Sequence, residues 1–409
     1  MSSEIASLGY LRNKLSEKCK KVKKRYAFYE MKNSVPDFRI STPPRLRNMV
    51  SILGWCGKAV DSLADRLVFR EMRGDDFGTN EIFRMNNPDV LFDSAVLSAL
   101  ISSCCFVYIS PDENGKPRLQ VIDGGSATGV IDPITGMLKT GYAVLERDRK
   151  TGAPTAEAYF TPGTTTYVYA SGEQRQYNYP ISQTLLVPIV YRPDAVRPFG
   201  RSVISRACMS LVASACRTVK RTEISAEFFS FPQKYIVGLS EDAEIADKWS
   251  ASMSTLLTIS EGENGEKPTL GQFAQQSMSP HNEQLKTLAS LFAGETGLTV
   301  EDMGFSSGNP ASQEAIKAAH ENLRLKARKA QRCFGSGFLN VAYVAACLRD
   351  EHDYKRSAFA EVKPIWEPIF EPDSAMLSGI GDGAIKINQA VPGYFTEENL
   401  RDLTGIEKR

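Results

Sequence analysis

The amino-acid sequence predicts an α+β protein in which long helices flank an antiparallel β-meander. Apolar residues alternate with polar ones, with regular turns, from residue 105 to about residue 191. Neither glycine nor proline occurs in the 31 residues between Gly200 and Pro232, which is typical of a long helix. The chain has 409 residues, of which 42% are hydrophobic. This composition excludes wholesale disorder and is enough for two to three domains with cores of their own.

The first part of the chain is predicted to change from helices to strands. Apolar residues at helical spacing predict helices over residues 51–69 and 88–103. Short alternating or β-branched segments, separated by turns such as Asp132-Pro133-Ile134-Thr135-Gly136, then predict strands at residues 105–109, 118–122, 128–131, 138–145, 156–160, 165–169 and 174–179. Because links this short join antiparallel neighbours, these strands form a β-meander.

A long helix and a small insert follow the meander. A helix over residues 201–230 would be roughly 40 Å long, so we expect it to pack against something equally long. Residues 231–280 carry three basic and seven acidic residues and read as an α/β insert, with strands at 234–237, 256–259 and 269–273 and a helix capped by Ser240. Another helix begins at Ser279-Pro280 and ends at the segment from Gly294 to Gly297.

A loop rich in serine and glycine separates this helix from a second long one. Asn309 and Pro310 are a plausible cap and first position for that helix, which is basic outside its apolar stripe. Gly335 and Gly337 cost about 2 kcal/mol relative to alanine in a helix interior, so we expect them to kink it. Two short helical patterns, at residues 374–390 and 396–403, complete the chain.

Charge is balanced overall but unevenly placed. The formal net charge of +1 excludes a protein that grips nucleic acid over its whole surface. Nine basic and two acidic residues lie between Arg12 and Lys32, whereas residues 350–409 carry seven basic and twelve acidic ones. The centre of the basic run is either a solvated helix face or a contact with a phosphate backbone or an acidic partner. It comprises Lys20, Lys21, Lys23, Lys24 and Arg25.

Residues that would carry enzyme chemistry are not arranged as known sites require. The chain has no Walker-type phosphate loop, no Gly-x-Ser-x-Gly elbow and no Cys-x-x-Cys pair. The three histidines do not form a metalloprotease motif, and His320 reads as a core histidine. The eight cysteines read as ordinary buried thiols of a reducing compartment. We therefore expect no catalytic residues, metal or cofactor, and neither a secretory signal nor a membrane span, in a chain that is soluble and intracellular when made.

The order of predicted elements resembles the portal proteins of tailed bacteriophages, of the siphophage type, over roughly residues 45–405. Two segments carry the resemblance. One runs from Val187-Pro188-Ile189-Val190-Tyr191 through Arg197-Pro198-Phe199-Gly200-Arg201-Ser202 into the long helix. The other, Ser306-Ser307-Gly308-Asn309-Pro310-Ala311-Ser312-Gln313-Glu314-Ala315, opens the basic helix and is similar to the family's segment after the tunnel loop. Other structural or binding proteins, and less so a metal-dependent enzyme, are the alternatives.

The resemblance implies a division of the chain and a role for each part. It implies an N-terminal basic arm (1–44), a wing (45–200), stem helices (201–230 and 281–298), a clip (231–280), a tunnel loop (299–311), a kinked helix (312–349) and a C-terminal wing or short crown (350–409). The implied channel loop residues are Met303, Gly304, Phe305, Ser306, Ser307, Gly308 and Asn309, and the implied motor-docking residues are Glu261, Glu263 and Glu266.

The partners follow from the same resemblance. Copies of the chain would form a ring, usually twelve-fold, at one capsid vertex of the virion, after assembly in the host cytoplasm. Double-stranded DNA would pass through the ring during packaging and ejection. The large terminase, the major capsid and scaffold proteins and a head–tail adaptor would bind it, and Lys20 to Arg25 are candidates for contact with DNA or the shell.

Overall fold

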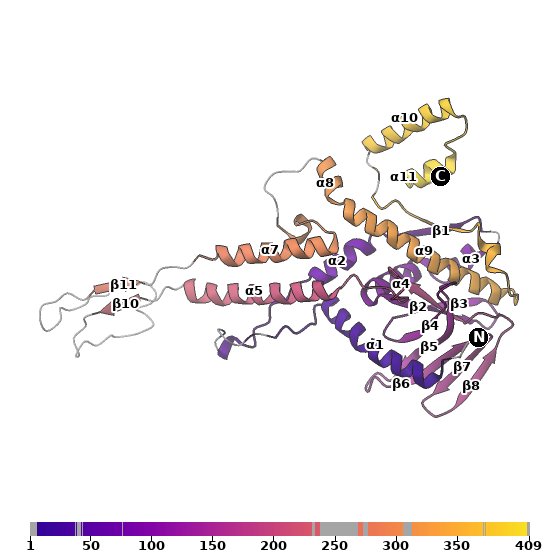
Figure 1. Ribbon diagram of the computed structural model, residues 1–409, viewed down its shortest axis with the longest axis horizontal. Coiled ribbons are helices and arrows are strands. Elements are labelled where there is room, and N and C mark those ends of the chain that lie inside the picture. Colours follow the sequence, from indigo (N-terminus) through magenta and orange to yellow (C-terminus); the bar gives the residue numbers. More distant parts are fainter. Residues whose placement is uncertain are drawn as a thin grey trace, which may run out of the picture.

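A computed structural model describes residues 6–36, 38, 42, 44–75, 77–230, 234–237, 269–272, 277–305, 313–370, 372 and 374–406. The described chain is an α+β protein, as predicted, with a body of helices and sheets from which a pair of antiparallel helices extends (Figure 1). A two-stranded sheet lies at the far end of this pair, and two short helices near the C-terminus lie beside the body (Figure 1).

The meander is present but forms two sheets. The larger has the order β4-β5-β6-β7-β8 and joins neighbours in the chain. The smaller has the order β3-β2-β9, so β2 pairs with a strand about 80 residues later. The bounds are β2 Cys104–Pro111, β3 Pro117–Ile122, β4 Ala127–Ile131, β5 Leu138–Arg147, β6 Pro154–Thr161, β7 Thr164–Tyr169, β8 Gln174–Asn178 and β9 Leu186–Val190. All seven predicted strands are confirmed.

The division into two sheets follows from burial. The first six residues of β2 are all buried, as expected of a strand covered on both faces. Helix α4 (Pro88–Ser102) and helix α9 (Glu321–Arg349) both pack against it. Strand β8, in contrast, is exposed along its whole length.

The N-terminal basic segment is a helix that packs onto the body. Helix α1 (Leu8–Tyr29) begins at Ser7, whose hydroxyl accepts a hydrogen bond from the backbone N–H of Tyr10. Leu11 and Leu15 are buried against Tyr142 and Val144 of β5. The residues expected to form an arm therefore contribute to the core through one face of α1.

Residues 51–69, predicted as one helix, contain a helix and the start of a strand. Helix α2 (Trp55–Ala64) ends early, and β1 (Phe69–Arg73) pairs antiparallel with β12 (Lys363–Trp366), with Phe69 opposite Trp366. The prediction was wrong at this end because the partner strand lies about 300 residues away. The short helix α3 (Thr79–Met85), which follows β1 in the chain, was also not predicted.

The extending pair consists of α5 (Arg206–Ser230) and α7 (Ser279–Thr296), which run side by side (Figure 1). Helix α5 begins five residues later than predicted because the preceding segment is bound to α4. There Ser202 donates a hydrogen bond to the carbonyl of Ile101, and the N–H of Val203 donates one to that of Leu100. Helix α7 ends as predicted, with Gly297 in the left-handed region at φ +80°.

Parts of the predicted insert lie outside the described residues. Strands β10 (Lys234–Val237) and β11 (Thr269–Gln272) pair antiparallel, which confirms two of its predicted strands. The strand expected at 256–259, the helix capped by Ser240 and the acidic residues Glu261, Glu263 and Glu266 are among those not described.

The second long helix is divided at a different place from the one predicted. Helix α8 (Gln313–Ala319) and helix α9 are separated at His320, whereas α9 runs without interruption through Gly335 and Gly337. A Cβ atom at position 335 would lie 2.6 Å from Cγ of Pro364 in β12, and one at position 337 would lie 2.8 Å from Cδ1 of Ile189 in β9. The glycines therefore allow strands to approach α9 closely; the predicted interruption there was wrong.

The C-terminal region contacts β1 through ion pairs. The predicted helices are confirmed as α10 (Ser374–Ala390) and α11 (Glu397–Thr404), with Thr396 capping α11. Arg73 of β1 makes two hydrogen bonds of 2.6 Å with the carboxylate of Asp402, and Arg401 pairs with Glu71. Hydrogen bonding from Arg73 lowers the pKa of Asp402 below its ordinary value. A bidentate pair of this kind fixes the orientation of α11.

We predict that Gly335→Ala destabilises the protein, although alanine favours the helix by about 1 kcal/mol. Overpacking against Pro364 costs about 1–3 kcal/mol, so the free energy of unfolding falls by up to about 2 kcal/mol. Denaturant unfolding of the variant measures this difference. Gly294→Ala is the matched control, since nothing lies within 4 Å of a Cβ atom at that helical position. A stability gain at both positions would show that Gly335 is not a packing requirement.

Candidate functional site

Hydrogen bonds between side chains set the register of α5 against α7. Ser205 donates to Oε1 of Glu295 at 2.8 Å near the body, and Thr218 donates to Oε1 of Gln284 at 3.3 Å midway. Residues that lie progressively later in α5 therefore meet residues progressively earlier in α7, and the two helices act as one antiparallel rod. Phe292 of α7 is fully buried and its ring lies 5.6 Å from that of Trp55 in α2, which fixes the base of the rod to the body.

The predicted channel loop begins at a well-anchored turn. The N–H of Thr299 donates to the carboxylate of Asp302, and the N–H of Asp302 donates to the hydroxyl of Thr299. Met303 is buried and Phe305 packs against the core, while Gly304 has φ +89°. Of the seven predicted residues, these three hold the start of the loop in place.

The other end of the loop joins α8. At the other end of α8, Nδ1 of His320 lies 3.7 Å from the carboxylate of Asp302, so the break between α8 and α9 is close to the turn where the loop begins. Ser306, Ser307, Gly308 and Asn309 lie outside the described residues.

The basic run divides into an exposed and a packed part. Lys20, Lys21, Lys23 and Lys24 are exposed on α1. Arg25 is half-buried and donates a hydrogen bond of 2.8 Å to the carbonyl of Ser102, and burial lowers the pKa of its guanidinium. The nearby Lys18 ammonium lies about 5 Å from the rings of Phe106 and Phe199. Four of the five predicted residues are thus accessible to a partner, while Arg25 helps to dock α1.

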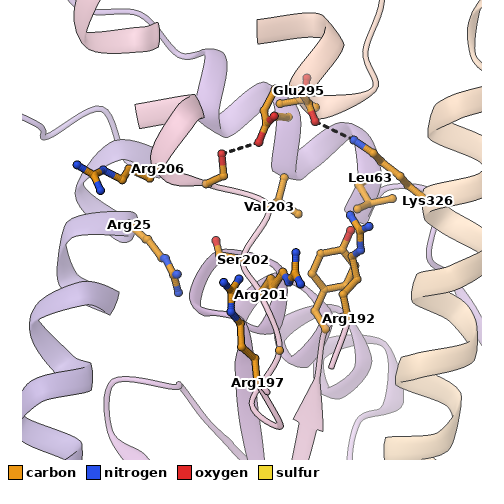
Figure 2. A pocket seen from close by; sticks show the side chains of 15 residues that line it. Arg25, Leu63, Arg192, Arg197, Arg201, Ser202, Val203, Arg206, Glu295 and Lys326 are labelled. Atoms are coloured by element: carbon orange, nitrogen blue, oxygen red, sulfur yellow. Dashed lines mark hydrogen bonds between the residues drawn. The ribbon is translucent and has the colours of Figure 1, made fainter. Parts of the chain in front are cut away.

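Sequence reasoning missed a cavity of about 440 Å³ where α1, the base of the rod and α9 meet (Figure 2). Six cationic side chains and one carboxylate line this cavity. We call this cavity the arginine pocket; its charged residues are Arg25, Arg192, Arg197, Arg201, Arg206, Lys326 and Glu295. Glu295 accepts the hydrogen bond from Ser205, and Lys326 donates to its backbone carbonyl at 3.0 Å (Figure 2).

The pocket concentrates positive charge that the described residues only partly balance. Arg201 pairs with Asp194 at 2.6 Å, and burial followed by the charge of Arg192 lowers the pKa of Lys326. Arg197 and Arg206 are exposed, and no described residue accepts a hydrogen bond from their guanidinium groups or forms an ion pair with them. An anion is therefore the kind of ligand that this pocket suits.

The backbone before α5 has an unusual conformation that places these arginines. Arg192 has φ +50° and Gly200 has φ +69°. A Cβ atom on Gly200 would lie 2.0 Å from the carbonyl oxygen of Tyr191, which accepts a hydrogen bond from the N–H of Arg201. Only glycine fits this close approach. The segment Arg197-Pro198-Phe199-Gly200-Arg201, noted in the sequence, was the available signal for the pocket.

Three further findings concern metal binding, membrane spans and the cysteines. Among the described residues, no group of three or more His, Cys, Asp or Glu side chains could hold a metal ion. No helix in the described part of the chain is long and apolar enough to cross a membrane. All eight cysteines are free thiols; six are buried, as predicted, whereas Cys19 and Cys333 are half-buried.

Comparison with known proteins gives the family. The model of the family "Phage portal protein, SPP1 Gp6-like" matches residues 8–377. The chain belongs to this family. It is 23% identical over 402 residues to the portal protein of Mycobacterium phage D29, covering 93% of this chain and 81% of that one. The portal protein of Mycobacterium phage L5 is 23% identical over 399 residues, covering 92% and 80%.

Solved structures give more distant matches. A chain from the neck of an empty gene transfer agent particle has a TM-score of 0.47 and 13% identity, over 87% of this chain and 91% of that chain. A chain from the virion of a native gene transfer agent particle has a TM-score of 0.46 and 12% identity, over 87% and 90%. Membership of the portal family confirms the resemblance drawn from the sequence.

We predict that Gly200→Ala destabilises the protein by about 3 kcal/mol or more, because it combines a left-handed backbone with a steric clash against the Tyr191 carbonyl. Thermal unfolding measures the loss. Gly172→Ala is the control: φ there is +85° but nothing lies within 4 Å of a Cβ atom, so only the backbone cost of about 1 kcal/mol is expected. Equal effects at the two positions would contradict the clash.

Proposed function

We propose that copies of this portal protein assemble into a closed ring, usually twelve-fold, at one vertex of the capsid, and that double-stranded DNA enters and leaves through its axis. The observation that carries the proposal is the rod of α5 and α7 within a chain of the portal family. The rod extends from the body (Figure 1). The segment after α1 contacts one side of α5, where Lys220 donates a hydrogen bond to the carbonyl of Arg47, whereas other flanks carry exposed apolar side chains such as Leu291 of α7. Rods standing side by side in a ring would cover those flanks and enclose a channel.

The position of the loop after α7 supports passage of DNA. Met303 and Phe305 anchor its start, so Ser306 to Asn309 are the part available to contact a duplex in the channel. These short polar residues carry no charge. A channel must not bind DNA tightly, since each phosphate contact would have to be broken as the duplex moves. An uncharged loop meets that requirement, and the net charge of +1 for the chain is consistent with it.

Each remaining part of the chain is assigned a role in the same proposal. Residues 45–200 form the wing, 201–230 and 281–298 the stem, 231–280 the clip, 299–311 the tunnel loop, 312–349 the helix between wing and crown, and 350–409 a C-terminal wing or short crown. The break at His320 lies within this helix. Residues 1–44 form the basic segment, whose helix α1 packs on the wing.

The clip is assigned the docking of the packaging motor. Strands β10 and β11 lie at the end of the rod away from the body (Figure 1), where a partner outside the capsid would bind. The acidic residues Glu261, Glu263 and Glu266 would make the contact with the large terminase electrostatic and therefore sensitive to salt. The head–tail adaptor would use this end after packaging.

The exposed lysines of α1 are assigned a contact with DNA or with the shell. Lys20, Lys21, Lys23 and Lys24 point away from the core that α1 covers, so a phosphate backbone or an acidic surface of the capsid or scaffold protein can reach them.

The chain itself supplies no nucleotide-binding loop, so the energy for DNA movement would come from the terminase rather than from the portal. We therefore assign no enzymatic activity to the chain.

We predict that the purified full-length chain forms rings with a central hole. Negative-stain or cryo-electron microscopy along the ring axis shows the hole, and mass photometry gives a mass that is a multiple of 45.1 kDa. The physical reason is that exposed apolar side chains of the rod, such as Leu291, would be covered in the assembly. A chain that stays monomeric across protein concentrations and moderate salt would contradict the proposed function.

We predict that deleting residues 306–308 blocks DNA packaging without blocking ring formation. The deletion leaves Met303 and Phe305 in the core, so the body folds, but it shortens the segment assigned to the channel. DNA-filled heads are counted by electron microscopy in an assembly reaction, and rings by mass photometry. Deleting residues 171–173, in the exposed turn between β7 and β8, is the control. Normal packaging by the 306–308 deletion would remove the loop from the mechanism.

A further inference from the structure

The arginine pocket has an electrostatic counterpart on the same chain. Asp65 follows the last residue of α2, Asp89 lies in the first turn of α4 and Asp93 lies one turn further on. We call these three residues the acidic patch. All three are exposed, and no described residue forms an ion pair or side-chain hydrogen bond with them. Asp89 and Asp93 are four residues apart on one face of α4, and α2, which ends just before Asp65, packs against α4. Partial burial, followed by the charges of Asp89 and Asp65, raises the pKa of Asp93.

The α2 member of the patch, Asp65, lies on the opposite side of that helix from the residues that line the pocket. Ala59 and Leu63 of α2 line the arginine pocket. Each residue of an α-helix is rotated by about 100° from the one before it, so Asp65 lies about 200° around the axis from Leu63. Backbone angles of −58° and −15° at Asp65 continue the helix to that position. No described residue of the pocket pairs with Asp65, Asp89 or Asp93, so the positive and the negative surface do not neutralise one another within one chain.

This arrangement favours one kind of assembly. A two-fold contact centred on the pocket would bring pocket against pocket and raise the repulsion between arginines. A head-to-tail contact places the patch of one copy against the pocket of the next. Head-to-tail contacts close into rings when the rotation between copies allows it.

We propose that the arginine pocket receives the acidic patch of a neighbouring copy of this chain, with Asp89 and Asp93 of that copy pairing with Arg197 and Arg206. The inference rests on the proposed ring and adds the contact that sets its direction. A cavity of about 440 Å³ with helices on several sides has room for a few side chains, whereas a duplex presents its phosphates on a convex cylinder. Val90, which is 61% exposed between the two aspartates, adds apolar area to the same contact.

Charge reversal of the full-length chain tests the contact. Arg197→Glu with Arg206→Glu, and separately Asp89→Lys with Asp93→Lys, are expected to convert rings to monomers in mass photometry. All four changes in one chain restore complementarity and are expected to restore rings. Lys139→Glu with Lys150→Glu and Glu113→Lys with Glu146→Lys are matched controls at exposed positions of the meander and keep their rings. Circular dichroism establishes that each variant is folded.

A cross-link places the contact independently of charge. Asp93→Cys and Arg206→Cys in one chain are expected to give a ladder of disulfide-linked multimers under mild oxidation, whereas either change alone gives none above the background of the native thiols. This readout holds even if a charge-reversed variant fails to fold.

The outcomes separate this inference from the proposed function. A wild-type chain that never forms rings overturns the ring itself. Wild-type rings together with normal assembly of both reversed variants overturn the pocket-to-patch contact and leave the ring standing. Normal assembly with loss of binding to a double-stranded DNA fragment for Arg197→Glu with Arg206→Glu also overturns it and assigns the pocket to phosphate. Loss of rings in both reversed variants with recovery in the combined one supports the contact.

Discussion

Burial of the second half of α9 is the constraint on which the rest of the body depends. Nearly every residue from Phe334 to Leu348 is buried, so sheets and helices must cover this stretch on all sides. The ring of Phe338 lies 4.6 Å from that of Phe92 in α4, and β9 and β12 approach the helix at its glycines. A helix that is apolar all round requires such a complete cover. The first half of α9 remains partly exposed, and its Lys326 contacts the end of α7.

The rod and the loop inherit their positions from this core. Phe292 and Trp55 fix the base of α7, and Thr299 with Asp302 fixes the turn that follows. The parts assigned to DNA and to the motor therefore extend from a rigid frame. Rigid frames that carry loops of variable sequence are a common way of placing function. In the proposed ring this frame would hold the start of the channel loop in a fixed position.

Charge is used differently at the surface and in the pocket. The exposed lysines of α1 lie on a solvated face, where an isolated ion pair contributes little. Arg25, from the same run, is half-buried and donates a hydrogen bond to the carbonyl of Ser102. The basic run therefore combines exposed lysines with an arginine that docks α1 on the body. In the arginine pocket, cations from three separate parts of the chain meet. Their shared repulsion is what a partner's carboxylates would relieve.

The sequence by itself determined the elements whose stabilising contacts are local. The meander strands, the long helix of the rod, the proline start of α7 and the glycine that ends it follow from alternation, spacing and capping, and the family followed from their order. Only the tertiary structure decided the contacts between distant residues. It placed β1 against β12, used Gly335 for close packing rather than for a kink, and gathered the arginines of the pocket. The physical reason is that periodicity reports which face of an element is apolar, whereas the identity of what covers that face depends on the whole fold.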